Sequence, residues 1–185
     1  MTFLLPFDWT VLIALTSHQT YGWIIAAIIV SELGRATTIA LLTLALALYL
    51  GLKRHFILMQ GLVLAVATSG IMTFLLKGAV ARPRPPMQYW AYHEIWWSFP
   101  SAHSALSMAF YGFVAYIALR TTHSKSLRIL ALTFAAALIL IIGFTRLYLG
   151  VHYLSDVLGG YLLGATCVWL GIWAARSLER GSMSA

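Results

Sequence analysis

Long apolar runs separated by short polar stretches form the dominant pattern of this chain. Five of them predict membrane-spanning helices, at residues 36–52, 56–76, 101–119, 129–144 and 153–175. A helix needs about 20 mainly apolar residues to cross the hydrocarbon core of a bilayer, and these runs approach or reach that length. The pattern therefore predicts an all-α fold, a polytopic transmembrane helix bundle.

A further apolar run at residues 9–30 is less regular, because Ser17-His18-Gln19-Thr20 interrupts it. It fits either one tilted crossing or two shorter helices that lie in the membrane interface. We favour one crossing, which gives six spanning helices, with five as the alternative. Residues 1–185 then form a single transmembrane domain.

Composition supports a membrane location. Hydrophobic residues make up 61% of the chain and charged residues 9%, whereas a soluble domain carries about 25% charged residues. The net charge of +7 fits cytoplasmic loops and contact with anionic membrane lipids rather than nucleic acid. Cys167 is the only cysteine, so neither an intrachain disulfide nor a thiolate metal site is possible.

The basic residues predict an orientation. If the helices alternate in direction, seven basic residues fall at one end of the bundle, which should face the cytoplasm: Lys53, Arg54, Arg120, Lys125, Arg128, Arg176 and Arg180. The opposite end still holds five: Arg35, Lys77, Arg82, Arg84 and Arg146. Anion binding at the extracytoplasmic end would explain why those five are there.

Three clusters meet at that second end. Lys77 to Pro85 begins a proline- and aromatic-rich connection that runs to Pro100, Phe99 to Ser104 begins the next helix, and Thr145 to Asp156 joins the last two helices. A helix that begins near Ser101 presents free backbone N–H groups, which together with lysine and arginine side chains suit a phosphate. His152 and Asp156 are four residues apart, so they share one face of a helix. The two histidines of these clusters, His103 and His152, can then divide the roles of nucleophile and acid between them.

These clusters resemble the three-part signature of the type 2 phosphatidic acid phosphatase superfamily of membrane lipid phosphatases. The family pattern is Lys-x6-Arg-Pro, Pro-Ser-Gly-His and Ser-Arg-x5-His-x3-Asp. Here it appears as Lys77…Arg84-Pro85, Pro100-Ser101-Ala102-His103 and Thr145-Arg146…His152…Asp156, within a resemblance that covers about residues 33–175. Arg82 is an extra arginine outside the pattern. Two residues depart from it: Thr145 keeps a hydroxyl, whereas Ala102 in place of glycine would be strained if that position required a positive φ.

The resemblance implies a role for each matched residue. His152 is expected to take the phosphoryl group as a phosphohistidine, with Asp156 orienting its ring, and His103 is expected to protonate the departing oxygen. The expected phosphate ligands are Lys77, Arg84, Ser101, Ala102 and Arg146. The active site is expected at the extracytoplasmic face of a plasma (inner) membrane, open to the periplasm or the cell exterior.

The chain has five acidic residues and no carboxylate cluster near these motifs. We therefore expect turnover without a metal or another cofactor, with a bell-shaped pH dependence. The expected partners are membrane lipids and a lipid phosphate of the undecaprenyl diphosphate, phosphatidylglycerophosphate, phosphatidic acid or lipid A type. The alternatives are a lipid phosphotransferase of the same family and an anion-transporting bundle without enzymatic activity. Vanadium haloperoxidases share the superfamily, but the spanning helices favour lipid chemistry.

Overall fold

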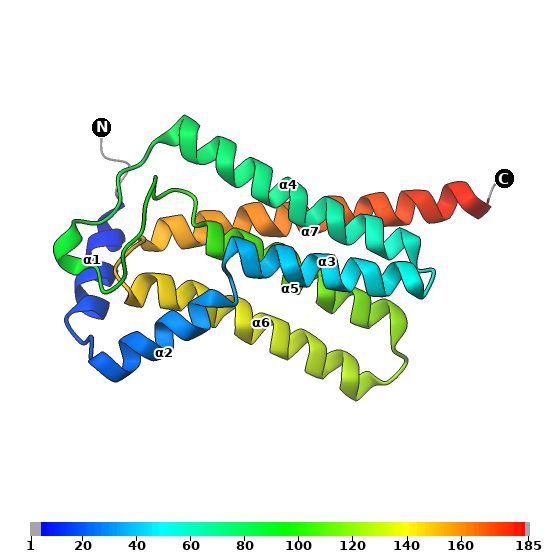
Figure 1. Cartoon of the computed structure of the whole chain (residues 1–185), viewed down its shortest axis with the longest axis horizontal. Helices are drawn as coiled ribbons and strands as arrows, with labels where there is room; N and C mark the ends of the chain where they lie inside the picture. Colours follow the sequence, from blue (N-terminus) through cyan, green and yellow to red (C-terminus); the bar gives the residue numbers. More distant parts are fainter. Residues whose placement is uncertain (1–4, 184–185) are drawn as a thin grey trace.

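The computed structural model describes residues 5–183, and these residues form helices without any β-strand. The elements in chain order are α1 (Pro6–Thr16), α2 (Tyr21–Glu32), α3 (Ala36–Leu52), α4 (Phe56–Val80), the short 3-10 helix η1 (Met87–Tyr89), α5 (Ala102–Thr121), α6 (Lys125–Tyr148) and α7 (Leu154–Met183). Helices α4, α5 and α7 pack against one another, with α3 beside α4 and α6 beside α5 (Figure 1). This confirms the predicted all-α bundle.

Among residues 5–183, four helices are long and apolar enough to cross a membrane: α4, α5, α6 and α7. By length and composition they are the helices of a multi-pass membrane protein. Helices α2 and α3 pass the same test as a pair, bent by 41° at a short break, and would supply a fifth crossing. Gly34 lies in that break, where a Cβ atom would come within 3.3 Å of the His103 carbonyl oxygen, so glycine allows the turn to approach α5.

The single crossing expected over residues 9–30 is wrong, because the run folds as two separate helices. At the break, the Gln19 side chain donates a hydrogen bond to the Tyr148 carbonyl (2.6 Å), and the Tyr148 hydroxyl lies near the backbone of His18 and Thr20. These polar contacts with the end of α6 stabilise a turn where we expected a continuous helix. Residues 5–183 therefore supply four or five candidate crossings, and six is not reached.

The helix ends follow from local chemistry. Ser101 and Ser124 are N-caps, each with a side-chain oxygen that accepts a hydrogen bond from a backbone N–H of the first turn. Helix α4 ends at Ala81, which has a left-handed φ of 47°, shortly before Pro83. After α6, Leu149 is the C-cap, and Gly150 turns the chain toward α7 with a φ of 70°.

Candidate active site

The three motif clusters lie together at the end of the bundle that also holds α1 and the α4–α5 connection (Figure 1). Arg84 of the first cluster places its Nη1 atom 3.0 Å from Nε2 of His152 in the third. The backbone N–H of Ser101 in the second cluster donates to the Asp156 carbonyl oxygen at 3.0 Å. Segments far apart in sequence thus build one site.

His152 is buried in the turn between α6 and α7, with 2% of its surface exposed. Its Nδ1 atom lies 3.4 Å from Oδ2 of Asp156, and Nε2 faces the Arg84 guanidinium. A guanidinium can only donate hydrogen bonds, so Nε2 accepts and the ring hydrogen is on Nδ1, directed at Asp156. This tautomer leaves the lone pair of Nε2 on the side of the arginine.

The surroundings of His152 also set its charge. Burial, followed by the positive charges of Arg84, Arg146 and Lys77, holds the pKa of His152 well below its ordinary value of 6.5. The imidazole is therefore neutral at physiological pH, which is the state that a nitrogen nucleophile requires.

Asp156 is fully buried at the start of α7, and each of its oxygens is engaged. Oδ2 accepts hydrogen bonds from the Ser98 hydroxyl at 2.5 Å and the Tyr153 N–H at 2.9 Å, in addition to facing His152. Oδ1 pairs with Nη1 of Arg82 at 2.5 Å. These contacts fix the carboxylate that orients the His152 ring.

Arg82, the arginine outside the signature, therefore belongs to the site. Its second guanidinium nitrogen pairs with Asp8 of α1 at 2.8 Å, and its first also donates to the Ser155 hydroxyl at 2.7 Å. Asp8 is itself fully buried and accepts a hydrogen bond from the Ser155 backbone N–H at 2.9 Å. A buried chain of alternating charges thus links α1 to Asp156.

The three cations expected to hold phosphate are all present at the site and all have partners in the protein. Lys77 donates to the carbonyl oxygens of Trp97 and Ser98. Arg84 donates to the carbonyl oxygen of Val151 at 2.8 Å and to two carbonyls of the α4–α5 connection. Arg146 is 1% exposed, donates to the Ser31 hydroxyl at 2.6 Å and forms an ion pair with Glu94.

The start of α5 places the second cluster beside these cations. Ser101 is the N-cap and Ala102 is the first helical residue. Positive φ angles among non-glycine residues 5–183 occur at Arg54, Ala81 and Trp96, so Ala102 carries no such strain. His103 follows in the first turn, close enough to Arg146 for the charge of the guanidinium to act on it. Within residues 5–183 its ring makes no hydrogen bond, so it is free to contact a ligand.

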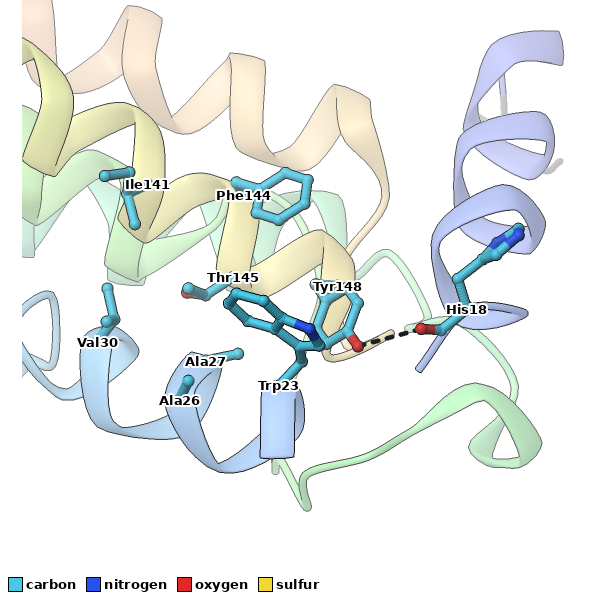
Figure 2. Close-up of a pocket in the computed structure, with 9 residues that line it drawn as sticks. All are labelled: His18, Trp23, Ala26, Ala27, Val30, Ile141, Phe144, Thr145 and Tyr148. Atoms are coloured by element: carbon cyan, nitrogen blue, oxygen red, sulfur yellow. Dashed lines mark hydrogen bonds between the residues drawn. The ribbon is translucent and has the colours of Figure 1, made fainter. Parts of the chain in front are cut away.

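Two hollows open at this end of the molecule. An open cleft of about 650 Å³ leads to Arg84 and Glu94 between aromatic walls that include Trp90, Trp96 and Trp97. A separate groove of about 470 Å³ lies between α2 and α6 and is lined almost entirely by apolar surface (Figure 2). Because Arg84 lines the first hollow and none of the three site cations lines the second, we interpret the aromatic cleft as the entrance to the site.

The structure adds three candidate site residues that the sequence analysis did not identify: Asp8, Glu94 and Ser98. None of them stands in a recognisable motif, and their partners lie 52 to 74 positions away in the chain, at Arg146, Asp156 and Arg82. The sequence offers one indication of their importance: acidic residues are rare, and Asp8 and Glu94 are two of only five in the chain. In residues 5–183, no three His, Cys, Asp or Glu side chains group together in a way that would hold a metal ion.

Comparison with known proteins gives a consistent result. The family model of the PAP2 superfamily matches residues 58–180. Phosphatidylglycerophosphatase B of Bacillus subtilis (strain 168) is 32% identical over 114 residues, which cover 59% of this chain and 54% of that protein. Lipid A 1-phosphatase of Rhizobium johnstonii is 32% identical over 124 residues, covering 62% of this chain and 46% of that protein. The match thus spans about half the length of these relatives.

Solved structures share the fold. The chain superposes on a transmembrane PAP2-type phosphatidylglycerolphosphate phosphatase from Bacillus subtilis with a TM-score of 0.82 at 23% identity, covering 94% of this chain and 85% of that one. It superposes on LpxE of Aquifex aeolicus with a TM-score of 0.71 at 18% identity, covering 93% and 99% of the two chains. The bundle architecture is therefore the same in all three proteins.

Proposed function

This chain belongs to the PAP2 superfamily, and on that premise we propose that it is a membrane lipid phosphatase that acts through a phosphohistidine. The substrate is the phosphate or diphosphate monoester of a lipid. The observation that carries the proposal is the environment of His152: a neutral imidazole whose Nε2 lone pair faces Arg84, within the influence of Arg146 and Lys77, while its Nδ1–H faces a buried carboxylate.

The reaction proceeds in two steps. Nε2 of His152 attacks phosphorus, the bond from phosphorus to the lipid oxygen breaks, and His103 gives its proton to that oxygen. The imidazole becomes positively charged as it takes the phosphoryl group, and Asp156 stabilises that charge through Nδ1–H. In the second step His103 removes a proton from water, the water oxygen bonds to phosphorus, and phosphate leaves as Nε2 is released.

Fixed cations carry the charge of the transition state. In this proposal Lys77, Arg84 and Arg146 hold the equatorial phosphoryl oxygens, and the backbone N–H of Ala102 adds the positive end of the α5 dipole. Phosphoryl transfer needs mainly positioning and electrostatic stabilisation, which these protein groups would provide. We therefore propose turnover that needs no metal ion.

The substrate enters from the membrane. The aromatic cleft is lined by amphipathic rings of the kind that lie at the headgroup level, so a lipid tail can stay in the bilayer while its phosphate reaches Arg84. The relatives' names favour phosphatidylglycerophosphate and lipid A phosphates, and undecaprenyl diphosphate and phosphatidic acid belong to the same chemical class. We place the site at the extracytoplasmic face of the plasma membrane, because the larger set of basic residues lies at the opposite end of the chain's alternating helices.

Phosphate release from lipids in detergent tests this proposal. Wild type and His152→Ala are compared with EDTA present, on phosphatidylglycerophosphate, undecaprenyl diphosphate, phosphatidic acid and a lipid A phosphate. Release that resists EDTA and disappears in the variant supports the proposal, and the ranking of the substrates names the preferred lipid. If wild type releases no phosphate but transfers the phosphoryl group to an added acceptor lipid, the protein is a phosphotransferase. Anion flux in liposomes that persists in His152→Ala would instead support transport.

A further inference from the structure

One continuous stretch of the α4–α5 connection, Glu94–Ser98, contacts all three cations of the site. The carbonyl oxygens of Ile95 and Trp96 accept from Arg84, and those of Trp97 and Ser98 accept from Lys77. The Glu94 carboxylate pairs with Arg146 and lies 3.6 Å from Nη2 of Arg84. This stretch thus presents oxygen atoms to the same three cations that we propose as phosphate ligands.

Glu94 differs from the rest of the stretch because it carries a negative charge. The other two carboxylates of this region, Asp8 and Asp156, pair with Arg82 instead. Among residues 5–183, Glu94 is the only acidic residue that pairs with Arg84 or Arg146. It also lines the open cleft and is 18% exposed, whereas Arg146 behind it is 1% exposed. The carboxylate therefore lies between the entrance and the deepest cation of the site.

From this arrangement we propose that Glu94 determines specificity by competing with the substrate for Arg84 and Arg146. Every ligand must displace the carboxylate, and this common cost leaves phosphomonoesters, which carry two negative charges, able to bind at concentrations where phosphodiesters, which carry one, are excluded. The inference rests on the proposed function, because it assigns the selectivity of the same anion site.

The charges explain the selection. Exchanging the Glu94 carboxylate for a phosphodiester replaces one negative charge with another, so the cations gain no additional neutralisation. The diester must also lose its freedom of motion in order to bind. A phosphomonoester brings a second negative charge and further oxygens, which form charge-assisted hydrogen bonds with the remaining donors. A charged group that disfavours the wrong ligand is a common device of specificity.

Glu94 can be displaced from the cations without unfolding a helix. The stretch belongs to an irregular connection between α4 and α5, so its withdrawal breaks no helix. Two residues along, Trp96 has a φ of 79°, an unusual backbone conformation for a bulky residue. The selectivity also suits the setting, because the common glycerophospholipids of a bilayer are phosphodiesters and would surround the entrance of this site.

Equilibrium binding of two small anions tests the inference without turnover. Inorganic phosphate at about pH 8 is mainly a dianion, whereas dimethyl phosphate is a monoanion that mimics a phosphodiester. Their Kd values are measured by isothermal titration calorimetry on purified wild type, Glu94→Gln and Glu94→Ala in detergent. Glu179→Gln is the matched control, because Glu179 pairs with Arg120, outside the three motif clusters.

We expect wild type to bind phosphate at least tenfold more tightly than dimethyl phosphate. Both Glu94 variants should bind dimethyl phosphate and phosphate each about tenfold more tightly than wild type does, since the same competing charge has been removed for both anions. Glu179→Gln should match wild type. Kd values within twofold of wild type in both Glu94 variants, or weaker binding of both anions, would overturn the inference.

The same experiment separates this inference from the proposed function. If the Kd values change as expected but no lipid releases phosphate, the selectivity of the anion site stands and the proposed hydrolysis fails. If lipids are hydrolysed but the Glu94 variants bind both anions as wild type does, the hydrolysis stands and the competition fails. If no variant binds phosphate at all, the anion site itself is absent and both fail.

Discussion

The Nη1 atom of Arg84 lies 3.0 Å from Nε2 of His152, so the arginine proposed to bind phosphate and the nitrogen proposed as nucleophile face each other across the site. The same guanidinium donates to the Val151 carbonyl at 2.8 Å, which holds it against the α6–α7 turn. Arg84, His152 and Asp156 thus lie in a row in which each side chain faces the next. A phosphoryl group that binds Arg84 is brought to Nε2 by the same contact.

The charge environment of His152 predicts the acid limb of the pH profile. His152 must be neutral to attack, and its pKa is lowered by burial and by Arg84, Arg146 and Lys77. Activity should therefore persist to lower pH than an ordinary histidine allows, with the midpoint of the acid limb of kcat/KM below 6.5. The phosphate of the substrate titrates near pH 6, so the profile is measured with two substrates whose phosphate pKa values differ. An acid limb above 6.5 that is the same for both substrates would contradict the assignment.

The role of His103 predicts a dependence on the leaving group. His103→Ala should reduce kcat/KM on an alkyl phosphate by about 10²- to 10⁴-fold, the usual contribution of general acid catalysis. An aryl phosphate with an acidic leaving group needs no proton, so the variant should be close to wild type on that substrate. His152→Ala, the comparison variant, should lose activity on both. An equal loss on both substrates in His103→Ala would remove the acid role.

The buried series Asp8, Arg82 and Asp156 predicts a non-additive effect on stability. Arg82→Gln leaves two buried carboxylates without their counter-charge, which should lower the free energy of unfolding by about 3–5 kcal/mol. Adding Asp8→Asn removes one of those carboxylates, so the double variant should be more stable than Arg82→Gln alone. Arg120→Gln, which breaks a half-exposed pair with Glu179, should cost less than about 1 kcal/mol. SDS unfolding of purified wild type and the three variants measures these stabilities. A double variant less stable than Arg82→Gln would refute the coupling.

The contact between α5 and α7 depends on a glycine. A Cβ atom at Gly164 would lie 2.7 Å from the Met108 Cβ atom and would also meet the Ala105 carbonyl oxygen. Gly164→Ala should therefore destabilise the protein by about 1–3 kcal/mol through overpacking. Gly22→Ala in α2 is the control, because a Cβ atom there meets nothing within 4 Å. Thermal unfolding in detergent that ranks the two variants in the opposite order would contradict the packing.

The later helices and the motif positions could be predicted because each depends on a short, continuous stretch of sequence. Apolar runs predict α4 to α7, and the start of α5 at Ala102 lies one residue from the expected Ser101. Helix α4 continues to Val80, four residues beyond the expected end, and Lys77 within that last turn contacts the carbonyls of Trp97 and Ser98. The glycines of α7 allow close approach of α5.

The N-terminal helices and the outer part of the site depend on contacts that no local pattern reveals. The break between α1 and α2 is stabilised by the contact of Gln19 with Tyr148, 129 residues away. The proline- and aromatic-rich connection after α4 holds a single carboxylate, Glu94, and nothing in the sequence indicates that it pairs with Arg146. A lone acidic residue becomes informative only once the fold shows which cation it faces.

Trapping the phosphorylated enzyme tests the central claim most directly. Wild type is mixed with a lipid phosphate labelled in its phosphoryl group, quenched in alkali during turnover, digested and analysed by mass spectrometry. We predict a phosphoryl group on the peptide that contains His152, stable in alkali and lost in acid, and absent from His152→Ala. Turnover by wild type with no phosphoryl group on His152, or phosphate release by His152→Ala at a rate near that of wild type, would contradict the account.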